Sequence, residues 1–127
     1  MEMKDMIERL SQLRHLKREV DELSQRIGEL EERAMGGSAR PMGMLRSGRL
    51  DCMEELGRLY AFIDDLPDSQ LRQIFAARYI DGLSWQNVAR RIGETDEQVP
   101  RRLHNRALRK KIAEMAKFDE KDENNLL

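Results

Sequence analysis

The sequence predicts an all-α protein, built from an N-terminal helical arm and a C-terminal domain of three helices. Apolar residues recur at steps of three and four along most of the chain, which is the spacing of an amphipathic helix. Glycine and proline number only 8 and 3 among 127 residues, and most of them stand between the apolar patterns. Apolar residues make up 39% of the chain and aromatic residues 5%, so we expect exposed helices rather than a thick core.

Composition also narrows the classes of function. Cys52 is the only cysteine, which excludes an internal disulfide, argues against a metal cluster and is most simply a small core residue. No apolar run reaches the length of a membrane span, and the N-terminus is polar and acidic rather than signal-like. The carboxylates have no matching histidine or serine arrangement, and no glycine loop suited to phosphate is present. We therefore expect a cytoplasmic protein that is not an enzyme, carries no metal or cofactor and does not bind a membrane.

Residues 1–35 are predicted to form one long helix. From residue 13 onward the apolar positions alternate steps of three and four, which is the heptad seam of a coiled coil. The seam consists of Leu13, Leu16, Val20, Leu23, Ile27, Leu30 and Ala34. Met3, Ile7 and Leu10 keep a similar spacing but slip by one residue, so we expect the helix to continue with a shifted face.

Residues 36–49 are predicted to be a glycine- and arginine-rich connector. Gly36 and Gly37 can end a helix, and Pro41 hinders the start of a new one. A second helix is expected over residues 50–66. Its seam consists of Cys52, Leu56, Leu59, Ile63 and Leu66.

Residues 1–66 would then form an arm with two apolar seams. The seams can pair as an antiparallel hairpin within one chain or as a coiled coil between chains, and both arrangements remain open.

Three closely spaced helices are expected over residues 67–118. Asp68 or Ser69 can cap the first helix, which runs to about Ile80 and is closed at Gly82. One side of this helix is formed by Leu71, Ile74, Phe75 and Tyr79.

The next two helices have their own end signals. Ser84 caps the second helix, and Gly93 ends it. Thr95 caps the third helix, and Gln98 three residues later completes a capping box. Residues 119–127 are predicted to be a frayed acidic tail.

The second and third of these helices match a helix-turn-helix. That motif requires a small residue where the helices touch, a glycine in the turn and a branched apolar residue early in the second helix. Ala89, Gly93 and Val99 supply the three. In the recognition helix, Val99, Leu103 and Ala107 are expected to face the core.

The positive charge of the chain is concentrated on this recognition helix. The net charge is −1, but residues 99–118 hold seven basic side chains against Glu114 alone. With a helix-turn-helix beneath it, this block predicts binding to double-stranded DNA, and arginine and asparagine suit contacts with base edges. The predicted base-reading residues are Gln98, Arg101, Arg102 and Asn105. The predicted phosphate contacts are Ser84, Gln86, Thr95, Arg106, Arg109 and Lys110.

Five other residues can be interpreted either as DNA contacts or as structural side chains. Arg78 and Arg90 could each touch phosphate or pair with a carboxylate, and both alternatives stay open. Trp85 is expected to pack half-buried on the first helix of the motif. His104 could touch DNA or lie on the surface, and His15 is expected on the surface.

Three pieces of residues 71–112 carry a family resemblance. They are RYIDGLSW (residues 78–85), the pattern VA-x-x-IG (88–93), and the pattern V-x-x-R-L-H (99–104) with the basic run after it. This stretch resembles region 4 of bacterial sigma-70-type sigma factors, and in particular the module of phage-encoded late-gene activators of the ArpU and RinA type. The resemblance covers about a third of the chain. It implies a transcription regulator of phage or prophage origin that binds promoter DNA and can touch RNA polymerase.

Two features depart from that family. Pro100 stands near the start of the recognition helix, where it removes a backbone donor, so we expect a kink or a late helix start. No counterpart of sigma region 2 is present, so the resemblance implies an activator or adaptor rather than a complete sigma factor.

The sequence therefore predicts a sequence-specific DNA-binding transcriptional regulator. A homodimer through the helical arm is expected, because paired half-sites increase the affinity of DNA readers. Two rival functions remain. One is a phage DNA-packaging factor similar to a small terminase subunit, and the other is a coiled-coil adaptor that binds RNA polymerase.

Overall fold

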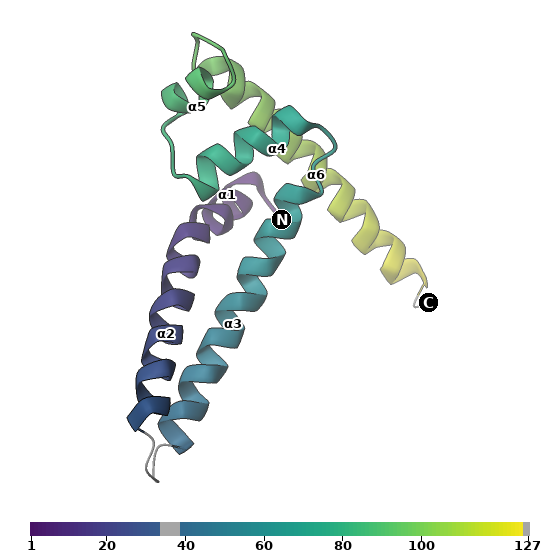
Figure 1. Cartoon of the computed structure of the whole chain (residues 1–127). Helices are drawn as coiled ribbons and strands as arrows, with labels where there is room; N and C mark the ends of the chain where they lie inside the picture. The colour runs from purple at the N-terminus through teal and green to yellow at the C-terminus, as the bar shows by residue number, and fades with distance from the viewer. Residues whose placement is uncertain (34–38, 126–127) are drawn as a thin grey trace.

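The computed structural model describes residues 1–33 and 39–125, and every regular element in these two ranges is helical (Figure 1). The predicted all-α class is therefore confirmed. The elements are α1 (Met3–Ser11), α2 (Leu13–Arg33), α3 (Ala39–Asp64), α4 (Ser69–Phe75), the π-helical turn η1 (Ala76–Ile80), α5 (Trp85–Arg91) and α6 (Gln98–Asn125).

The arm is an antiparallel hairpin of α2 and α3 within one chain (Figure 1). The seam of α2 faces α3, and Ile27 and Met42 are buried in the far half of the hairpin. Arg46 pairs with Glu31 at 2.9 Å across the two helices. Of the two arrangements that the seams allow, the structure thus has the one within a chain.

The N-terminal segment is two helices rather than the one long helix predicted. The break falls at Gln12, where the seam slips by one residue. The bend turns α1 away from the axis of α2 and across the top of the arm (Figure 1). It turns Met6 and Leu10 toward the head, where they are buried together with Leu13 in one core.

The connector predicted over residues 36–49 is also wrong for most of its length. Helix α3 begins at Ala39, so residues 39–49 are helical. Pro41 is the third residue of α3, where its missing N–H would have had no partner inside the helix. Gly36 and Gly37 lie outside the described residues, as does Ala34 of the predicted seam.

The main core lies where the arm meets the head, which we define as α4, η1, α5 and α6. It joins residues from both sides of the boundary predicted between residues 66 and 67. Its buried members are Met6, Leu10, Leu13, Leu59, Phe62, Ile63, Leu66, Phe75, Tyr79 and Leu108. A smaller cluster of Ile74, Ala77 and Val88 lies inside the head. Arm and head therefore share one apolar core.

Helix α6 extends much further than expected. It is helical to Asn125, so the acidic segment predicted to fray continues the helix through that residue. Neither glycine nor proline occurs after Pro100, and nothing in this stretch therefore interrupts the helix. None of the helices in the described ranges combines the length and apolarity needed to cross a membrane.

Candidate nucleic-acid interface

The two helices predicted to form a helix-turn-helix correspond to α5 and α6, at the top of the head (Figure 1). Ser84 Oγ accepts a hydrogen bond from the backbone N–H of Asn87 at 3.3 Å, which fixes the start of α5 as predicted. Gly93 has a φ of 82°, a left-handed conformation that allows the chain to turn sharply after α5. Ala89 is buried between the helices, in the place expected for the small residue of the motif.

The start of α6 differs from the prediction. Asp96, not Thr95, closes the first turn, because its Oδ1 accepts a hydrogen bond from the backbone N–H of Gln98 at 2.9 Å. Thr95 is exposed in the preceding loop. Helix α6 begins at Gln98, so Pro100 lies in its first turn, and the late start expected from this proline is confirmed.

The inward face of α6 is centred one residue later than predicted. Its buried residues are Pro100, His104 and Leu108. Val99, Leu103 and Ala107, which were expected to face the core, are only half-buried. The prediction counted only ordinary apolar residues, and it therefore missed a row that contains a proline and a histidine.

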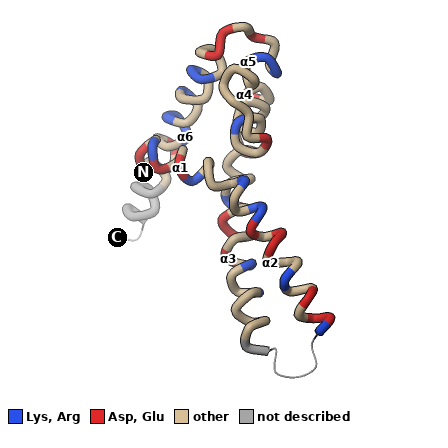
Figure 2. The backbone as a smooth tube through the Cα atoms, turned by 90° about the vertical axis from the view of Figure 1, so that its left-hand side faces the viewer, with Lys and Arg blue, Asp and Glu red and all other residues tan. Residues whose placement is uncertain are grey.

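Five cations lie on the solvent side of α6, and we call them the basic face. They are Arg101, Arg102, Arg106, Arg109 and Lys110, and all are exposed, as is Gln98. They span about 14 Å along the helix axis at 1.5 Å per residue. Figure 2 shows basic positions recurring along α6 where it leaves the top of the head. The burial of the opposite face thus leaves the predicted cations together on one accessible surface.

The basic face has carboxylates nearby, because Arg106 and Lys110 line a pocket that also contains Asp65, Asp68 and Glu114. Among the side chains that the structure describes, no ion pair involves any of its five cations. Arg102 Nε instead donates to the carbonyl oxygen of Gln98 at 3.3 Å. Lys111, in contrast, is half-buried, pairs with Asp65 and lies 5.9 Å from the ring centre of Phe62. The charges of the basic face are therefore free for an anionic partner, whereas Lys111 ties α6 to the arm.

Trp85 lies between two guanidinium groups at the base of the basic face. Arg78 stacks over its ring at 4.8 Å and also donates to the carbonyl oxygen of Leu83 at 2.9 Å. Arg101 approaches the same ring at 5.9 Å. Trp85 is half-buried, as predicted. Among the described residues Arg78 has no carboxylate partner, because a carbonyl group and an aromatic ring hold it, and its contact with phosphate stays a prediction.

A chain of buried polar groups lies beneath Trp85. His104 is 1% exposed, stacks on Phe75 at 4.6 Å and meets the edge of Trp85 at 5.0 Å. Its Nδ1 lies 2.9 Å from Oδ1 of Asn105, and its Nε2 lies 2.7 Å from the hydroxyl of Tyr79. Both surface roles considered for His104 are therefore wrong.

The chemistry of these groups fixes their protons. Oδ1 of Asn105 can only accept, so Nδ1 of His104 carries the proton. Burial lowers the pKa of His104, helped by the nearby charges of Arg78 and Arg101, and the hydrogen bond to Asn105 only partly opposes this. The ring is therefore neutral near pH 7, and its bare Nε2 accepts from the Tyr79 hydroxyl. Burial raises the pKa of Tyr79 to about 12, which keeps that hydroxyl protonated.

The structure places most of the predicted contact residues on the same end of the head. Ser84, Gln86 and Thr95 are exposed at or near the starts of α5 and α6. Asn105 is half-buried, and its carbonyl oxygen is already bonded to His104.

The sequence contains one signal for the burial of His104, because Pro100, His104 and Leu108 are spaced by four and therefore share one face of the helix. Tyr79, which makes the burial of His104 possible, is 25 positions away in the chain.

His15 and Cys52 lie outside the basic face. His15 is exposed, as expected. Cys52 is half-buried in the hairpin, where burial and the nearby Glu19 carboxylate raise its pKa. No group of three or more potential metal ligands occurs within the described ranges.

The chain was compared with protein-family models, with characterised proteins and with solved structures, and none of the three comparisons gave a match.

Proposed function

We propose that this protein is a sequence-specific DNA-binding transcriptional regulator that places α6 in the major groove of double-stranded DNA. The observation that carries the proposal is the basic face. It has five exposed cations on the recognition helix of a helix-turn-helix, and none of these cations forms an ion pair with a described side chain.

The first turns of α6 are the part that would read bases. Gln98, Arg101 and Arg102 project from this part, and arginine makes bidentate contacts with guanine. Asn105 lies at the edge of the same surface. Because its carbonyl oxygen is bonded to His104, the amide NH₂ is the group that it would offer to a base.

The remaining polar groups fit the DNA backbone. Arg106, Arg109 and Lys110 continue the basic face along the helix, where phosphates run beside the groove. Ser84, Gln86 and Thr95 lie near the N-termini of α5 and α6. The first N–H groups of a helix have no partner within it and therefore favour a phosphate group nearby.

The resemblance of residues 71–112 to sigma region 4 supplies two further parts of the proposal. They are an origin in a phage or prophage and RNA polymerase as a protein partner. Both rest on that resemblance alone.

The test is selection of bound sequences from a pool of random duplex DNA, repeated at two salt concentrations. We expect a defined motif to be enriched, and log affinity to fall with log salt by about 0.9 for each phosphate contact. Binding that is weak at low salt and enriches no motif would contradict the proposal and favour the adaptor function.

A charge-matched pair of variants makes this test specific to the basic face. Arg106→Glu reverses a charge on that face, and Arg33→Glu makes the same change at the far end of α2. We expect the first variant to lose DNA affinity and the second to retain it. Equal losses would mean that only the overall charge of the chain matters.

A further inference from the structure

Helix α3 carries a second heptad row beside the one that packs on α2, and Arg46 of this row pairs with Glu31 of α2. The row that faces α2 contains Met42, Leu45, Arg49, Cys52, Leu56 and Leu59, which are buried or half-buried. The second row lies one position further along and contains Gly43, Arg46, Leu50, Met53, Gly57 and Tyr60. Its spacing is three and four throughout, as in a helix that packs on another helix.

The middle of the second row is open in the single chain, whereas Tyr60 at its head end packs on the main core. Leu50 is 56% exposed and Met53 is 50% exposed. A Cβ atom added to Gly43 or Gly57 would meet nothing within 4 Å, whereas one added to Gly48 would touch Leu23 of α2. Glycine weakens an exposed helix, so two of them in open space bring no advantage to the hairpin itself. They do allow a second backbone to come close.

We propose that this row is the contact with α3 of a second copy of the chain, packed antiparallel. The row has the same spacing when read from either end, so two copies pair over its full length around a point between Leu50 and Met53. Each glycine then meets a large residue. Gly43 lies opposite Tyr60 of the second copy, and Gly57 lies opposite Arg46 of the second copy.

The side chains favour this orientation over a parallel one. In a parallel pair every residue meets its own copy, so Arg46 would face Arg46 across the contact. Like charges that face each other are destabilising, and glycine opposite glycine would leave gaps. The antiparallel pair avoids both faults and places Leu50 against Met53 at the centre.

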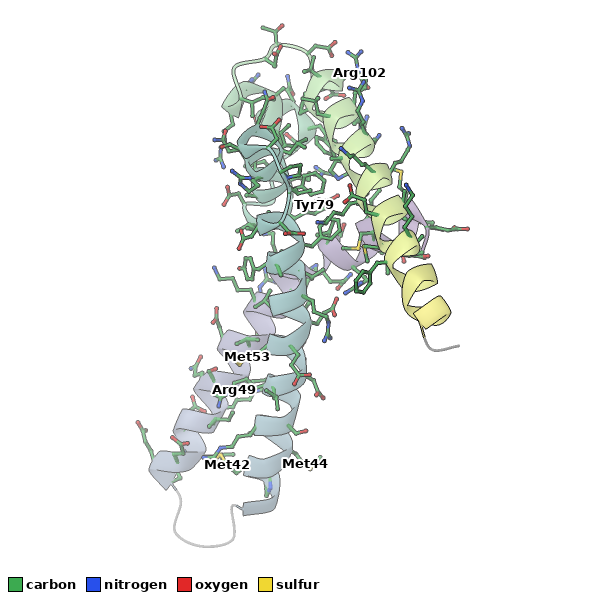
Figure 3. All side chains as sticks on the ribbon, turned by 90° about the vertical axis from the view of Figure 1, so that its right-hand side faces the viewer. Met42, Met44, Arg49, Met53, Tyr79 and Arg102 are labelled. Atoms are coloured by element: carbon green, nitrogen blue, oxygen red, sulfur yellow. The ribbon has the colours of Figure 1, made fainter. Side chains whose placement is uncertain are left out.

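Helix α6 does not run along the side of the arm that carries Met53. In Figure 3, Met53 and Met44 lie on opposite edges of α3, and the C-terminal part of α6 runs on the side of Met44. Tyr60 is half-buried at the head end of the row. Helix α6 therefore leaves Leu50 and Met53 exposed.

The antiparallel contact would place the two heads at opposite ends of the dimer. Asp64 is 12 to 13 residues from the centre of the row, so the two copies of this residue would lie about 38 Å apart along the axis. The two copies of α6 begin beyond Asp64 in the heads (Figure 1), so they would read half-sites more than one helical turn of DNA apart. This consequence for DNA rests on the proposed function, but the contact itself does not.

Single-cysteine variants test the contact and its direction without DNA. In a Cys52→Ser background, a cysteine is placed at Leu50, Met53, Gly43 or Gly57, and a short thiol cross-linker is added. In the antiparallel pair the two copies of residue 50 or 53 are offset by about 4–5 Å along the axis, and those of residue 43 by about 25 Å. We expect cross-linked dimers from Leu50→Cys and Met53→Cys and none from Gly43→Cys or Gly57→Cys. Equal cross-linking at all four positions would show a parallel pair and overturn the proposal.

Sedimentation velocity gives an independent measure of the same contact. The double variant Leu50→Glu with Met53→Glu should raise the dimer dissociation constant by on the order of tenfold or more. Met44→Glu, at a position 74% exposed on the other edge of α3, should leave it unchanged. Circular dichroism would check that all variants remain helical. A chain that stays monomeric, or forms larger rings, would overturn the dimer and leave the DNA proposal to its own test.

Discussion

The Tyr79 hydroxyl and Nε2 of His104 lie 2.7 Å apart inside the core that joins the arm to α6. Tyr79 belongs to η1 and His104 to α6, so this bond connects the first helix of the head to the helix that carries the basic face. His104 in turn donates to Asn105 on the surface. The position of the basic face thus depends on a histidine that is neutral and fully buried.

The first prediction concerns pH. The pKa of folded His104 lies below its ordinary value of 6.5, mainly because of burial. Above that value the imidazole is neutral in both the folded and the unfolded chain. As the pH falls below 6.5, the unfolded chain takes up a proton at this position and the folded chain does not, so the free energy of unfolding falls until the folded pKa is reached.

Urea unfolding from about pH 8 down to about pH 5 measures this loss, at about 1.4 kcal/mol for each unit of pKa difference. His104→Leu should flatten this part of the pH profile, whatever its stability at pH 7. The exposed His15 provides the control, because His15→Gln should leave the profile as it is. An unchanged slope in the His104 variant would show that other groups cause the loss.

The second prediction removes the hydroxyl from the buried pair. Tyr79→Phe keeps the ring but leaves Nε2 of His104 buried without a donor. We expect the free energy of unfolding to fall by about 1–3 kcal/mol, the cost of an unsatisfied buried group. Tyr60→Phe, at a half-buried position of α3, should change stability by less. A double-mutant cycle with His104→Leu would reveal a coupling near zero if the bond contributes nothing.

The third prediction concerns the turn before α5. Gly82 has a φ of 70°, and a Cβ at this position would overlap the guanidinium group of Arg14 on α2. Gly82→Ala should therefore lower the free energy of unfolding by about 1–2 kcal/mol. Adding Arg14→Ala should recover only part of this loss, because the backbone strain remains.

Gly28 is the matched control for Gly82. It lies within α2, and an added Cβ would meet nothing within 4 Å. Gly28→Ala should raise the free energy of unfolding by about 0.5–1 kcal/mol. Thermal or urea unfolding would contradict the account if the two alanine substitutions had the same sign.

The fourth prediction separates base contacts from phosphate contacts on the basic face. Arg101→Ala should cost about 1–3 kcal/mol of binding at the selected DNA sequence and little on unrelated DNA. Arg109→Ala should weaken binding to all sequences alike and reduce the salt slope by about 0.9. Titrations on both DNAs at two salt concentrations measure these effects. A uniform loss for Arg101→Ala would assign that residue to a phosphate instead.

Features that depend on neighbours in the chain could be predicted from the sequence. Asp68 accepts from the backbone N–H of Gln70 at 3.0 Å, Ser84 caps α5, and Gly93 has a positive φ after it. Each depends on the preference of one residue and a hydrogen bond of two or three positions. The same holds for the concentration of basic residues on one helix, which is visible in the order of the residues.

The extent of the helices depended on packing as well. Gly36, Gly37 and Pro41 predicted a connector, yet the facing α2 supplies enough contact to keep residues 39–49 helical. At Gln12 the helix is interrupted although the residues on both sides of it favour a helix. The bend buries Met6 and Leu10 against the head, a contact that no local pattern contains.

The sequence by itself determined that the chain is helical, where α4 begins, where α5 begins and ends, and that the positive charge of the head gathers on its last helix. These properties follow from local propensity, capping and helical periodicity. Only the tertiary structure decided that the arm folds back within one chain, that α1 turns onto the head, and that α6 buries Pro100, His104 and Leu108. Burial of a histidine is stable only with polar partners, and His104 finds one of them in Tyr79, which the fold brings to it from 25 positions away.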